Sequence, residues 1–338
     1  MPEVYGSAEL LVAAVADGAG FTREPFDKNA DSLSGSPFES VVIAGVTYVL
    51  KHLGRDIDWI MRAFGDGLHG TPPRVVVMWQ AGLFETLPDV LDHALVGASF
   101  NRDSGRAAIL MRDIGSTLVP TGTAAIDFAQ HRRFLDHMAA LHAAFWDFVD
   151  SYGLAPPDVA YTGLTPAMSA RESAAHHDDP VPRAIPAGWA QLRQAASPAY
   201  EVALALATDP MPLVEALAQT PSTLVHGDWK FGNLGSHPDG RTVLLDWAWS
   251  GRSAGCTDLA WYLAVNCDRL PESKEETVAA YRTSLERRGV ATTPWWDRQL
   301  ELALLGAFVQ LGWSKTTNPA ELAWWTTQVV PVGRRLLQ

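Results

Sequence analysis

HGDWKFGN occupies residues 226–233 of this chain, and the apolar run TVLL at 242–245 leads from it to Asp246. Apolar Leu224 and Val225 precede the octapeptide, so two short strand patterns flank it. The pattern therefore predicts a hairpin with a polar loop on one side and an acid at its far end. A carboxylate, a lysine and two further oxygen ligands in one such unit are the groups that phosphoryl transfer requires.

The polar residues of this hairpin suit different steps of that chemistry. Asp228 is a candidate to accept the proton of a substrate hydroxyl, or to orient that hydroxyl for attack. Lys230 is placed to meet the charge on the transferring phosphoryl group. Asn233 and Asp246 offer the oxygen ligands that Mg²⁺ prefers and shares with substrate phosphates. A histidine at position 226 braces such a loop through hydrogen bonds, and we favour this structural role for His226 over catalysis.

Length and composition bound the class of protein. The 338 residues predict two lobes around separate cores, and 47% hydrophobic with 19% charged residues is typical of a globular protein. A formal net charge of -12 argues against nucleic acid as a partner, because binding a phosphate backbone needs a basic surface. The same charge favours cationic small molecules, although solubility alone is the commoner reason for an acidic surface.

The cysteines and the N-terminus indicate a compartment. Two cysteines, Cys256 and Cys267, form neither a disulfide framework nor, by themselves, a four-ligand zinc site. The apolar patch at 10–15 has acidic rather than basic neighbours, which is unlike a secretory signal. No run of 18 apolar residues occurs, so we expect no membrane span. The sequence predicts a cytoplasmic protein.

The first hundred or so residues have a mostly β pattern. The stretch 38–53 contains two β-rich apolar runs separated by Ala44-Gly45, which predicts two strands joined by a tight turn. A helical pattern follows at 55–64, and the glycines and prolines of 65–73 break it. Three more strands are predicted at 75–79, 94–100 and 107–111. This part is predicted to be a β lobe with one inserted helix.

A helical lobe begins near residue 127. Apolar residues recur there at steps of three and four through Phe145, which is the pattern of an amphipathic helix. The proline-containing stretch 156–186 is predicted to be a long irregular connection, and its His176-His177 pair is expected to be exposed rather than to bind metal. Further helices are predicted at 189–208, 211–219, 256–266, 274–288, 296–313 and 319–337.

The arrangement HGD-x4-N followed by LLDW resembles the aminoglycoside phosphotransferase and choline kinase superfamily, which has the protein-kinase-like fold. The resemblance implies an α+β, bilobal fold with a nucleotide-binding lobe at 1–115, a hinge at 111–115 and a helical lobe at 116–338. It also implies that Asp228 is the catalytic aspartate, that Asn233 and Asp246 bind metal, and that the cofactors are ATP and Mg²⁺. HGD in place of HRD looks like the small-molecule kinases, whereas Lys230 looks like the protein-kinase loop.

The resemblance extends to the nucleotide site of the first lobe. Lys51 in YVLK looks like the strand lysine that contacts the α- and β-phosphates. By analogy the stretch 32–40 is the loop over the phosphates, and its single Gly35 departs from a glycine-rich pattern and leaves Ser34 and Ser36 as donors beside the backbone. In the family, an acidic residue of a helix pairs with this strand lysine. The predicted helix at 55–64 contains no glutamate, so Asp58 is the best candidate for that acid.

Two other segments resemble the hinge and the supporting helices. AAILMRDIG leads into the hinge, where backbone groups near Met111 and Asp113 are expected to hold adenine. LDHMAALHAAFW resembles the helix that supports the catalytic loop, so His142 is expected to be structural. Asp258 in TDLAWYLA matches an aspartate that stabilises the catalytic loop in the family.

Tryptophans mark the region where an acceptor is expected. Nine of the thirteen lie at or beyond Trp229, and aromatic faces stack on sugar rings and attract ammonium groups. Tryptophans at helical spacing are more often part of a core, so only one or two are assigned to the acceptor. The acceptor candidates are Trp249, Gln310 and Trp313.

The leading hypothesis is an ATP-dependent enzyme that moves the γ-phosphate to a hydroxyl of a small molecule, such as an aminoglycoside or another cationic or sugar-like acceptor. An amino-sugar kinase, glucosamine-like in specificity, or another metabolic kinase is the alternative. This alternative rests on a similarity to bacterial sugar kinases related to maltokinase. Those kinases commonly have glutamine at the position of Asn233, so this chain departs from them there.

Two other classes of protein are weighed against it. A catalytically silent ATP-binding protein fits the serine-rich loop and the missing helix glutamate. A binuclear metallohydrolase built from His226, Asp228, His237 and Asp246 gives no role to Lys230. The acceptor, the choice between ATP and GTP, and the oligomeric state are left open by the sequence.

Overall fold

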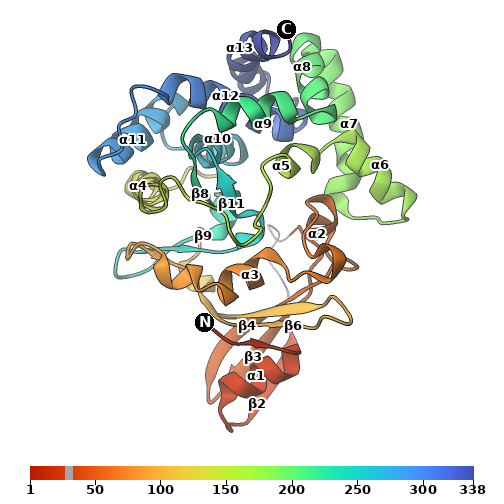
Figure 1. The fold of residues 1–338 in the computed structure, drawn as a ribbon, viewed down its shortest axis with the longest axis vertical. Coiled ribbons are helices and arrows are strands. Elements are labelled where there is room, and N and C mark those ends of the chain that lie inside the picture. The colour runs from red at the N-terminus through yellow and green to blue at the C-terminus, as the bar shows by residue number, and fades with distance from the viewer. Residues whose placement is uncertain (27–32) are drawn as a thin grey trace. The chain divides into compact units, whose positions relative to one another are not determined.

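The computed structural model describes residues 1–26 and 33–338, so Ser32 of the predicted phosphate loop lies outside the described residues. The contacts divide the chain into two compact units (Figure 1). The first unit contains residues 1–122, 151–154 and 231–248, and the second contains 123–150, 155–230 and 249–338. The HGDWKFGN stretch therefore begins in the second unit and ends in the first.

The first unit contains a six-stranded sheet with the strand order β1-β6-β7-β4-β3-β2. The predicted pair at 38–53 is present as antiparallel β3 and β4, joined at Ala44 and Gly45, which both have positive φ. The central strands carry β-branched and aliphatic side chains that pack on a half-buried sheet. The strands are β1 (Val4–Tyr5), β2 (Phe21–Pro25), β3 (Phe38–Ile43), β4 (Val46–Leu53), β6 (Leu95–Phe100) and β7 (Ala107–Arg112).

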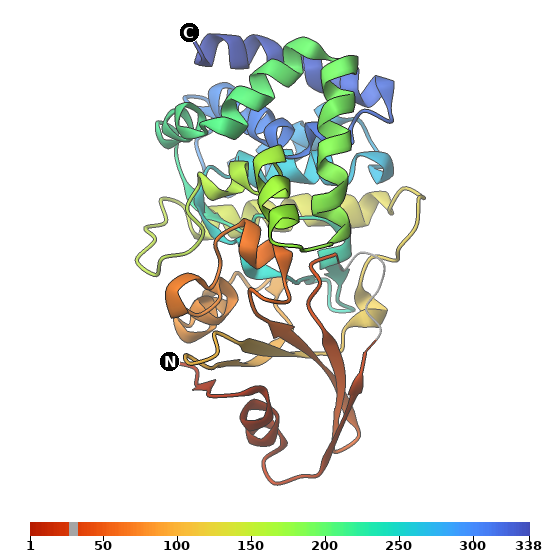
Figure 2. The same cartoon turned by 90° about the vertical axis from the view of Figure 1, so that its right-hand side faces the viewer.

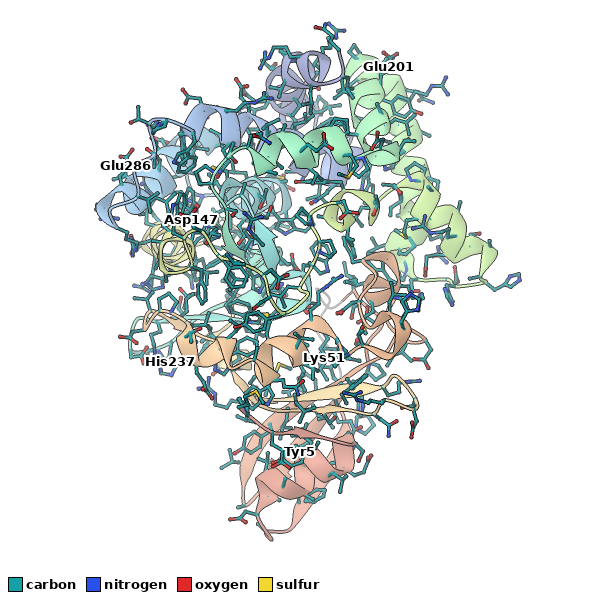
Figure 3. All side chains as sticks on the ribbon, in the orientation of Figure 1. Tyr5, Lys51, Asp147, Glu201, His237 and Glu286 are labelled. Carbon is teal, nitrogen blue, oxygen red and sulfur yellow. The ribbon has the colours of Figure 1, made fainter. Side chains whose placement is uncertain are left out.

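Helix α1 (Ala8–Ala16) packs against this sheet and contains the apolar patch noted at 10–15. The side chain of Ser7 caps it by accepting a hydrogen bond from the amide of Leu10 at 3.2 Å. Its buried face joins strand residues in one hydrophobic core, and Tyr5 packs against that core (Figure 3). The core consists of Leu11, Val12, Ala16, Val41, Ile43, Leu50, Ala108 and Leu110.

The stretch 75–79 was predicted as a strand, and this prediction is wrong, because α3 (Arg74–Gln80) covers it. The carbonyl of Pro73 accepts hydrogen bonds from the amides of Val76 and Val77, so the proline starts a helix that buries Val75 and Val76. Burial overrides the strand preference of three consecutive valines. The predicted helix at 55–64 is present only as α2 (Trp59–Ala63), and the short 3-10 helices η1 (Leu68–Gly70) and η2 (Leu83–Thr86) follow.

A second, three-stranded sheet of the first unit contains a hairpin, but not the pairing that the sequence predicted: 242–244 pairs with 234–236, whereas Leu224 and Val225 pair with Arg252 and Gly251 in another sheet. Its order is β5-β10-β9, with β9 (Leu234–Ser236) antiparallel to β10 (Thr242–Leu244) and β5 (Leu91–Asp92) parallel to β10. The 3-10 helices η3 (Gly115–Thr117), η4 (Phe231–Asn233) and η5 (Trp247–Trp249) lie next to these strands in sequence. The hairpin thus links the polar loop to Asp246.

The second unit is helical, and Figure 2 shows its helices from the side. Its one small sheet in the described part of the chain pairs β8 (Thr223–Val225) with β11 (Gly251–Ser253). The predicted helices from residue 211 onward are present within two residues of their expected ends. They are α9 (Met211–Ala218), α10 (Cys256–Val265), α11 (Lys274–Arg287), α12 (Trp296–Leu311) and α13 (Pro319–Leu336). The helix predicted to begin near residue 127 is α4 (Phe128–Ala144), and the short 3-10 helices η6 (Cys267–Arg269) and η7 (Gly312–Ser314) follow α10 and α12.

The stretch 156–186 is not an irregular connection, which corrects the prediction. It contains α5 (Val159–Thr162), α6 (Pro166–Ala174) and the start of α7 (Pro180–Ala195). Prolines occupy the first turns of α6 and α7, where a missing amide hydrogen loses no helix bond. The single helix predicted at 189–208 is two helices, because α8 (Ser197–Thr208) begins with its own proline. No helix of the described residues has the length and apolar character needed to cross a membrane.

A buried histidine of α4 is expected to make the stability of the second unit pH-dependent. Burial lowers the pKa of His137 from 6.5 to about 4, because desolvation disfavours the charged ring. The neutral ring therefore contributes stability above pH 6.5, and this contribution is lost as the pH falls from 6.5 toward 4. The loss amounts to at most about 3 kcal/mol.

Replacing His137 with glutamine should flatten the fall in melting temperature between pH 7 and pH 4, as measured by circular dichroism. His176 is exposed and offers the matched control. In His176→Gln the melting temperature should depend on pH as it does in the wild type. An unchanged slope in His137→Gln would contradict the assignment.

Candidate active site

The polar loop after β8 is held by one buried carboxylate of α10. The backbone amides of His226 and Gly227 donate to Oδ2 and Oδ1 of Asp258 at 2.8 and 2.7 Å. The ring Nδ1 of His226 accepts a hydrogen bond from the amide of Asp228 at 3.1 Å. Both His226 and Asp258 are buried, so these bonds are shielded from water. His226 and Gly227, which directly precede the predicted catalytic residue Asp228, are thus held in place.

The glycine of HGD has a local structural reason. Gly227 has φ +86, which side chains rarely adopt, and a Cβ there would lie 2.7 Å from both the Cβ and the carbonyl oxygen of Trp249. A larger residue would have to displace the backbone of Trp249. The fold of this loop therefore excludes the arginine of an HRD sequence.

Gly227→Ala is expected to destabilise the protein more than Gly240→Ala. Both glycines have positive φ, but a Cβ at Gly240 meets nothing within 4 Å, so this variant carries only the backbone cost of about 1–2 kcal/mol. The clash at Gly227 adds about 1–3 kcal/mol. Chemical unfolding of both variants measures the difference. Equal destabilisation would show that the contact with Trp249 is unimportant.

Asp228 is oriented by two groups of the second unit. Nε1 of Trp261 donates to its Oδ1 at 2.8 Å, and Nζ of Lys230 lies 3.5 Å from its Oδ2. Nδ2 of Asn266 donates to the carbonyl of Trp229 at 3.1 Å and holds the next residue of the loop. Sequence reasoning missed Trp261 and Asn266. The sequence did contain a signal for Trp261. It lies one helical turn after Asp258, so both side chains are on the same face of α10.

The two predicted metal ligands lie on the hairpin of the first unit. Asn233 ends η4, and its carbonyl accepts a hydrogen bond from the amide of Leu245 at 2.9 Å, so the backbones next to Asn233 and Asp246 are paired. Asp246 has φ 62, a conformation that aspartate and asparagine tolerate better than most residues. An amide and a carboxylate oxygen are hard donors that fit Mg²⁺, which takes few protein ligands and keeps phosphate or water oxygens as the others.

Lys51 lies beside Asp246, although 195 residues separate them in sequence. Its Nζ is 3.1 Å from Oδ1 of Asp246, and Lys51 is only 7% exposed. Figure 3 labels the Lys51 side chain in the first unit. The register places it on β4 opposite Phe38 of β3, with its ammonium 5.9 Å from the centre of the Phe38 ring. The structure therefore brings together the predicted phosphate-binding lysine and a predicted metal ligand.

Asp58, expected to pair with Lys51, makes different hydrogen bonds. Its carboxylate caps α2 by accepting from the amides of Ile60 and Met61 at 2.8 and 3.2 Å, and accepts from Oγ of Ser36 at 2.5 Å. Burial raises its pKa, and the charge of Lys51 acts in the opposite direction. The partner of Lys51 at ion-pair distance is Asp246, because Asp58 is committed to the start of α2.

The predicted phosphate loop is tied to α2. Ser34 and Ser36 are buried, Oγ of Ser34 accepts from the amide of Ser36 at 3.3 Å, and the carbonyl of Ser34 accepts from the amide of Trp59 at 3.1 Å. Gly35 between them has φ 90. The serine hydroxyls are therefore engaged within the protein, and the role of this loop at phosphates stays a prediction.

The predicted hinge residues lie at the end of β7 and directly after it in the first unit. Met111 is buried and pairs with Val49 of β4, and the amide of Asp113 donates to the carbonyl of Thr47 at 3.4 Å. Oδ1 of Asp113 accepts from the amide of Gly115 at 3.0 Å. The chain thus leaves the sheet at Asp113. Contact of these residues with adenine stays a prediction.

The acceptor candidates separate into two kinds. The ring of Trp249 packs edge-on against Trp261 at 5.0 Å between centroids, and Trp261 bonds Asp228. Trp313 instead packs against α7, because a Cβ at Gly188 of that helix would be 2.5 Å from the Trp313 ring. Nε1 of Trp313 donates to the backbone carbonyl of Gln310. Trp249 is therefore the candidate nearest the loop; the acceptor roles of Trp249, Gln310 and Trp313 stay predictions.

Among residues 1–26 and 33–338, no three His, Cys, Asp or Glu side chains form a group that could hold a metal ion. His237 pairs with Asp239, at 2.8 Å, in the turn between β9 and β10. The binuclear metallohydrolase hypothesis receives no support from this arrangement.

Residues 86–291 match the model of the phosphotransferase enzyme family. The match covers more than half of the chain, so the chain belongs to this family. A comparison with curated proteins finds no match.

Several solved structures are similar to this chain. The microcompartment-associated aminopropanol kinase has 12% sequence identity, covers 96% of this chain and 95% of its own, and has a TM-score of 0.52. LicA in complex with AMP has 12% identity, coverage of 95% and 96%, and a TM-score of 0.51; LicA is the choline kinase from Streptococcus pneumoniae. A thermostable mutant of aminoglycoside phosphotransferase APH(4)-Ia in its apo form has 13% identity, coverage of 96% and 97%, and a TM-score of 0.47. The first two confirm the α+β, bilobal protein-kinase-like fold.

Proposed function

We propose that this protein is an ATP- and Mg²⁺-dependent kinase that transfers the γ-phosphate to a hydroxyl of a small molecule. Membership of the phosphotransferase family supports phosphoryl transfer in general. The observation that carries the finer proposal is the 3.1 Å pair between Lys51 and Asp246. A nearly buried cation beside a hard oxygen ligand is suited to a nucleotide polyphosphate with its metal.

Each residue has a role that its surroundings support. Asp228 orients the acceptor hydroxyl and takes its proton, because its carboxylate is fixed by Trp261 and the loop beneath it by Asp258. Lys51 holds the α- and β-phosphates, and Lys230 meets the charge that develops on the transferred group. Asn233 and Asp246 would hold Mg²⁺, which when bound neutralises charge on the phosphate oxygens.

The acceptor site is proposed to lie at Trp249. Its ring next to the Trp261–Asp228 bond offers an aromatic face that suits a sugar ring or an ammonium group beside the phosphorylated hydroxyl. The net charge of -12 favours a cationic acceptor over an anionic one. Aminoglycosides, amino sugars and amino alcohols such as aminopropanol and choline share these features.

A panel of these alcohols tests the proposal through coupled detection of ADP. Wild-type protein should release ADP with at least one acceptor and only with Mg²⁺ present, and phosphorus NMR should identify a phosphate monoester. ATP with Mg²⁺ should also raise the melting temperature. Stabilisation by ATP without turnover on any acceptor would favour the catalytically silent alternative, whereas no effect of ATP would contradict nucleotide binding.

A further inference from the structure

We infer that the hydroxyl of Tyr281, on α11, is a positioning group for the catalytic loop, and that it acts through His142 and Asp258. The catalytic part of this inference rests on the proposed function. The structural part concerns only the second unit, where α4, α10 and α11 are neighbours (Figure 1). Tyr281 touches no part of the loop in the contacts described above, so its effect must pass through the two other side chains.

A continuous chain of hydrogen bonds connects Tyr281 with the loop. The hydroxyl of Tyr281 lies 2.6 Å from Nδ1 of His142, and Nε2 of His142 lies 3.1 Å from Oδ2 of Asp258. The same oxygen accepts the amide hydrogen of His226, and Oδ1 accepts that of Gly227. The side chains of Tyr281, His142 and Asp258 are at most 1% exposed, so water offers them no replacement partner.

The direction of these hydrogen bonds gives Tyr281 its influence. The Asp258 carboxylate is an acceptor, so Nε2 of His142 carries the hydrogen that it receives. In the neutral ring Nδ1 is then an acceptor, and the Tyr281 hydroxyl donates to it. Burial raises the pKa of Tyr281 well above 10, which keeps the hydroxyl protonated. Without this hydroxyl the buried Nδ1 of His142 loses its hydrogen-bond donor, and the contact with Asp258 alone holds the ring in place.

The space around this contact is tight. Gly255 precedes α10, and a Cβ there would lie 2.9 Å from the Tyr281 hydroxyl and 3.2 Å from Nδ1 of His142. Gly255 has φ -58, so it is not required for backbone conformation. The absence of a side chain at this position leaves room for the tyrosine and the histidine to meet.

A second chain of the same kind, a tyrosine, a histidine of α4 and a carboxylate, provides an internal control. Nδ1 of His131 is 2.8 Å from the Tyr262 hydroxyl, and its Nε2 is 2.8 Å from Oε1 of Glu272. Both histidines are buried on α4, eleven residues or three helical turns apart, so they lie on one face. This chain ends at Glu272, whose other carboxylate oxygen accepts from Arg132 rather than from the catalytic loop.

The test compares Tyr281→Phe with Tyr262→Phe, which remove one buried hydroxyl from the same kind of chain. Hydrogen–deuterium exchange of a peptide spanning 223–230 reports on the amides of His226 and Gly227, whether or not an acceptor is known. Exchange there should be several-fold faster in Tyr281→Phe and unchanged in Tyr262→Phe. With an acceptor in hand, kcat should fall roughly fivefold to tenfold in Tyr281→Phe alone, with KM for ATP unchanged.

The outcomes separate the inference from the proposed function. Equal loop exchange and equal kcat in the two variants would overturn the role of Tyr281 while leaving kinase activity of the wild type intact. Faster loop exchange in Tyr281→Phe would support the structural part even if no acceptor is phosphorylated. Should Tyr281→Phe fail to fold, Gly255→Ala crowds the same contact without removing a bond, and it should also speed exchange in 223–230; unchanged exchange in that variant would count against the inference.

Discussion

Replacing Asp228 with asparagine is expected to lower kcat for phosphoryl transfer by about 10²–10⁴-fold. Asparagine keeps an oxygen that accepts the hydrogen bond from Nε1 of Trp261, so the side chain retains its position. It cannot take a proton from the acceptor hydroxyl, and it removes the negative charge near Lys230. Binding of ATP with Mg²⁺ should persist, because Lys51, Asn233 and Asp246 are unchanged. Steady-state kinetics and a thermal shift with ATP measure the two effects separately.

The control for this variant is Asp239→Asn in the turn between β9 and β10. Asp239 is exposed, and its partners are Arg241 and His237 of the same turn. This variant should keep wild-type kcat. Activity of Asp228→Asn within threefold of that of Asp239→Asn would contradict the role of Asp228 as the group that receives the proton.

The sequence predicted those parts of the fold in which local pattern and burial agree. The antiparallel pair at 38–53 has alternating β-rich residues and a small-residue turn, and α11 has a Ser273–Glu276 capping box and an amphipathic pattern. Prediction failed where burial opposed local preference. Three valines in α3 favour a strand in isolation, but the helix that starts at Pro73 buries two of them, Val75 and Val76.

The candidate site divides in the same way. Asp228, Asn233 and Asp246 could be proposed from sequence because they follow one another at short spacing beside short strand patterns. Trp261 and Tyr281 were not, because their partners are 33 and 139 residues away, and nothing local to either residue shows which side chain it will meet. Lys51 was predicted, but its pairing with Asp246 was not, since Asp58 is nearer in sequence and is instead used to cap α2.

Replacing Asp246 with asparagine is expected to separate metal binding from the fold of the hairpin. Asparagine tolerates the positive φ of this position, so the backbone should be retained. The loss of charge removes the strongest proposed Mg²⁺ ligand and leaves the nearly buried Lys51 without its ion-pair partner. Charge stabilisation by a catalytic metal is worth several kcal/mol, so kcat should fall on the order of a thousandfold.

The decisive measurement for this variant is the dependence of thermal stabilisation on Mg²⁺. ATP should stabilise the wild type more with Mg²⁺ than without it, and this difference should disappear in Asp246→Asn. Asp92→Asn breaks another ion pair of the first unit, the one between Asp92 of β5 and Arg112 of β7, and should keep the difference. If Asp246→Asn also keeps it, Asp246 is not a metal ligand, and its pairing with Lys51 serves stability alone. If the difference is lost while ATP alone still binds, the carboxylate beside Lys51 joins the nucleotide to its metal.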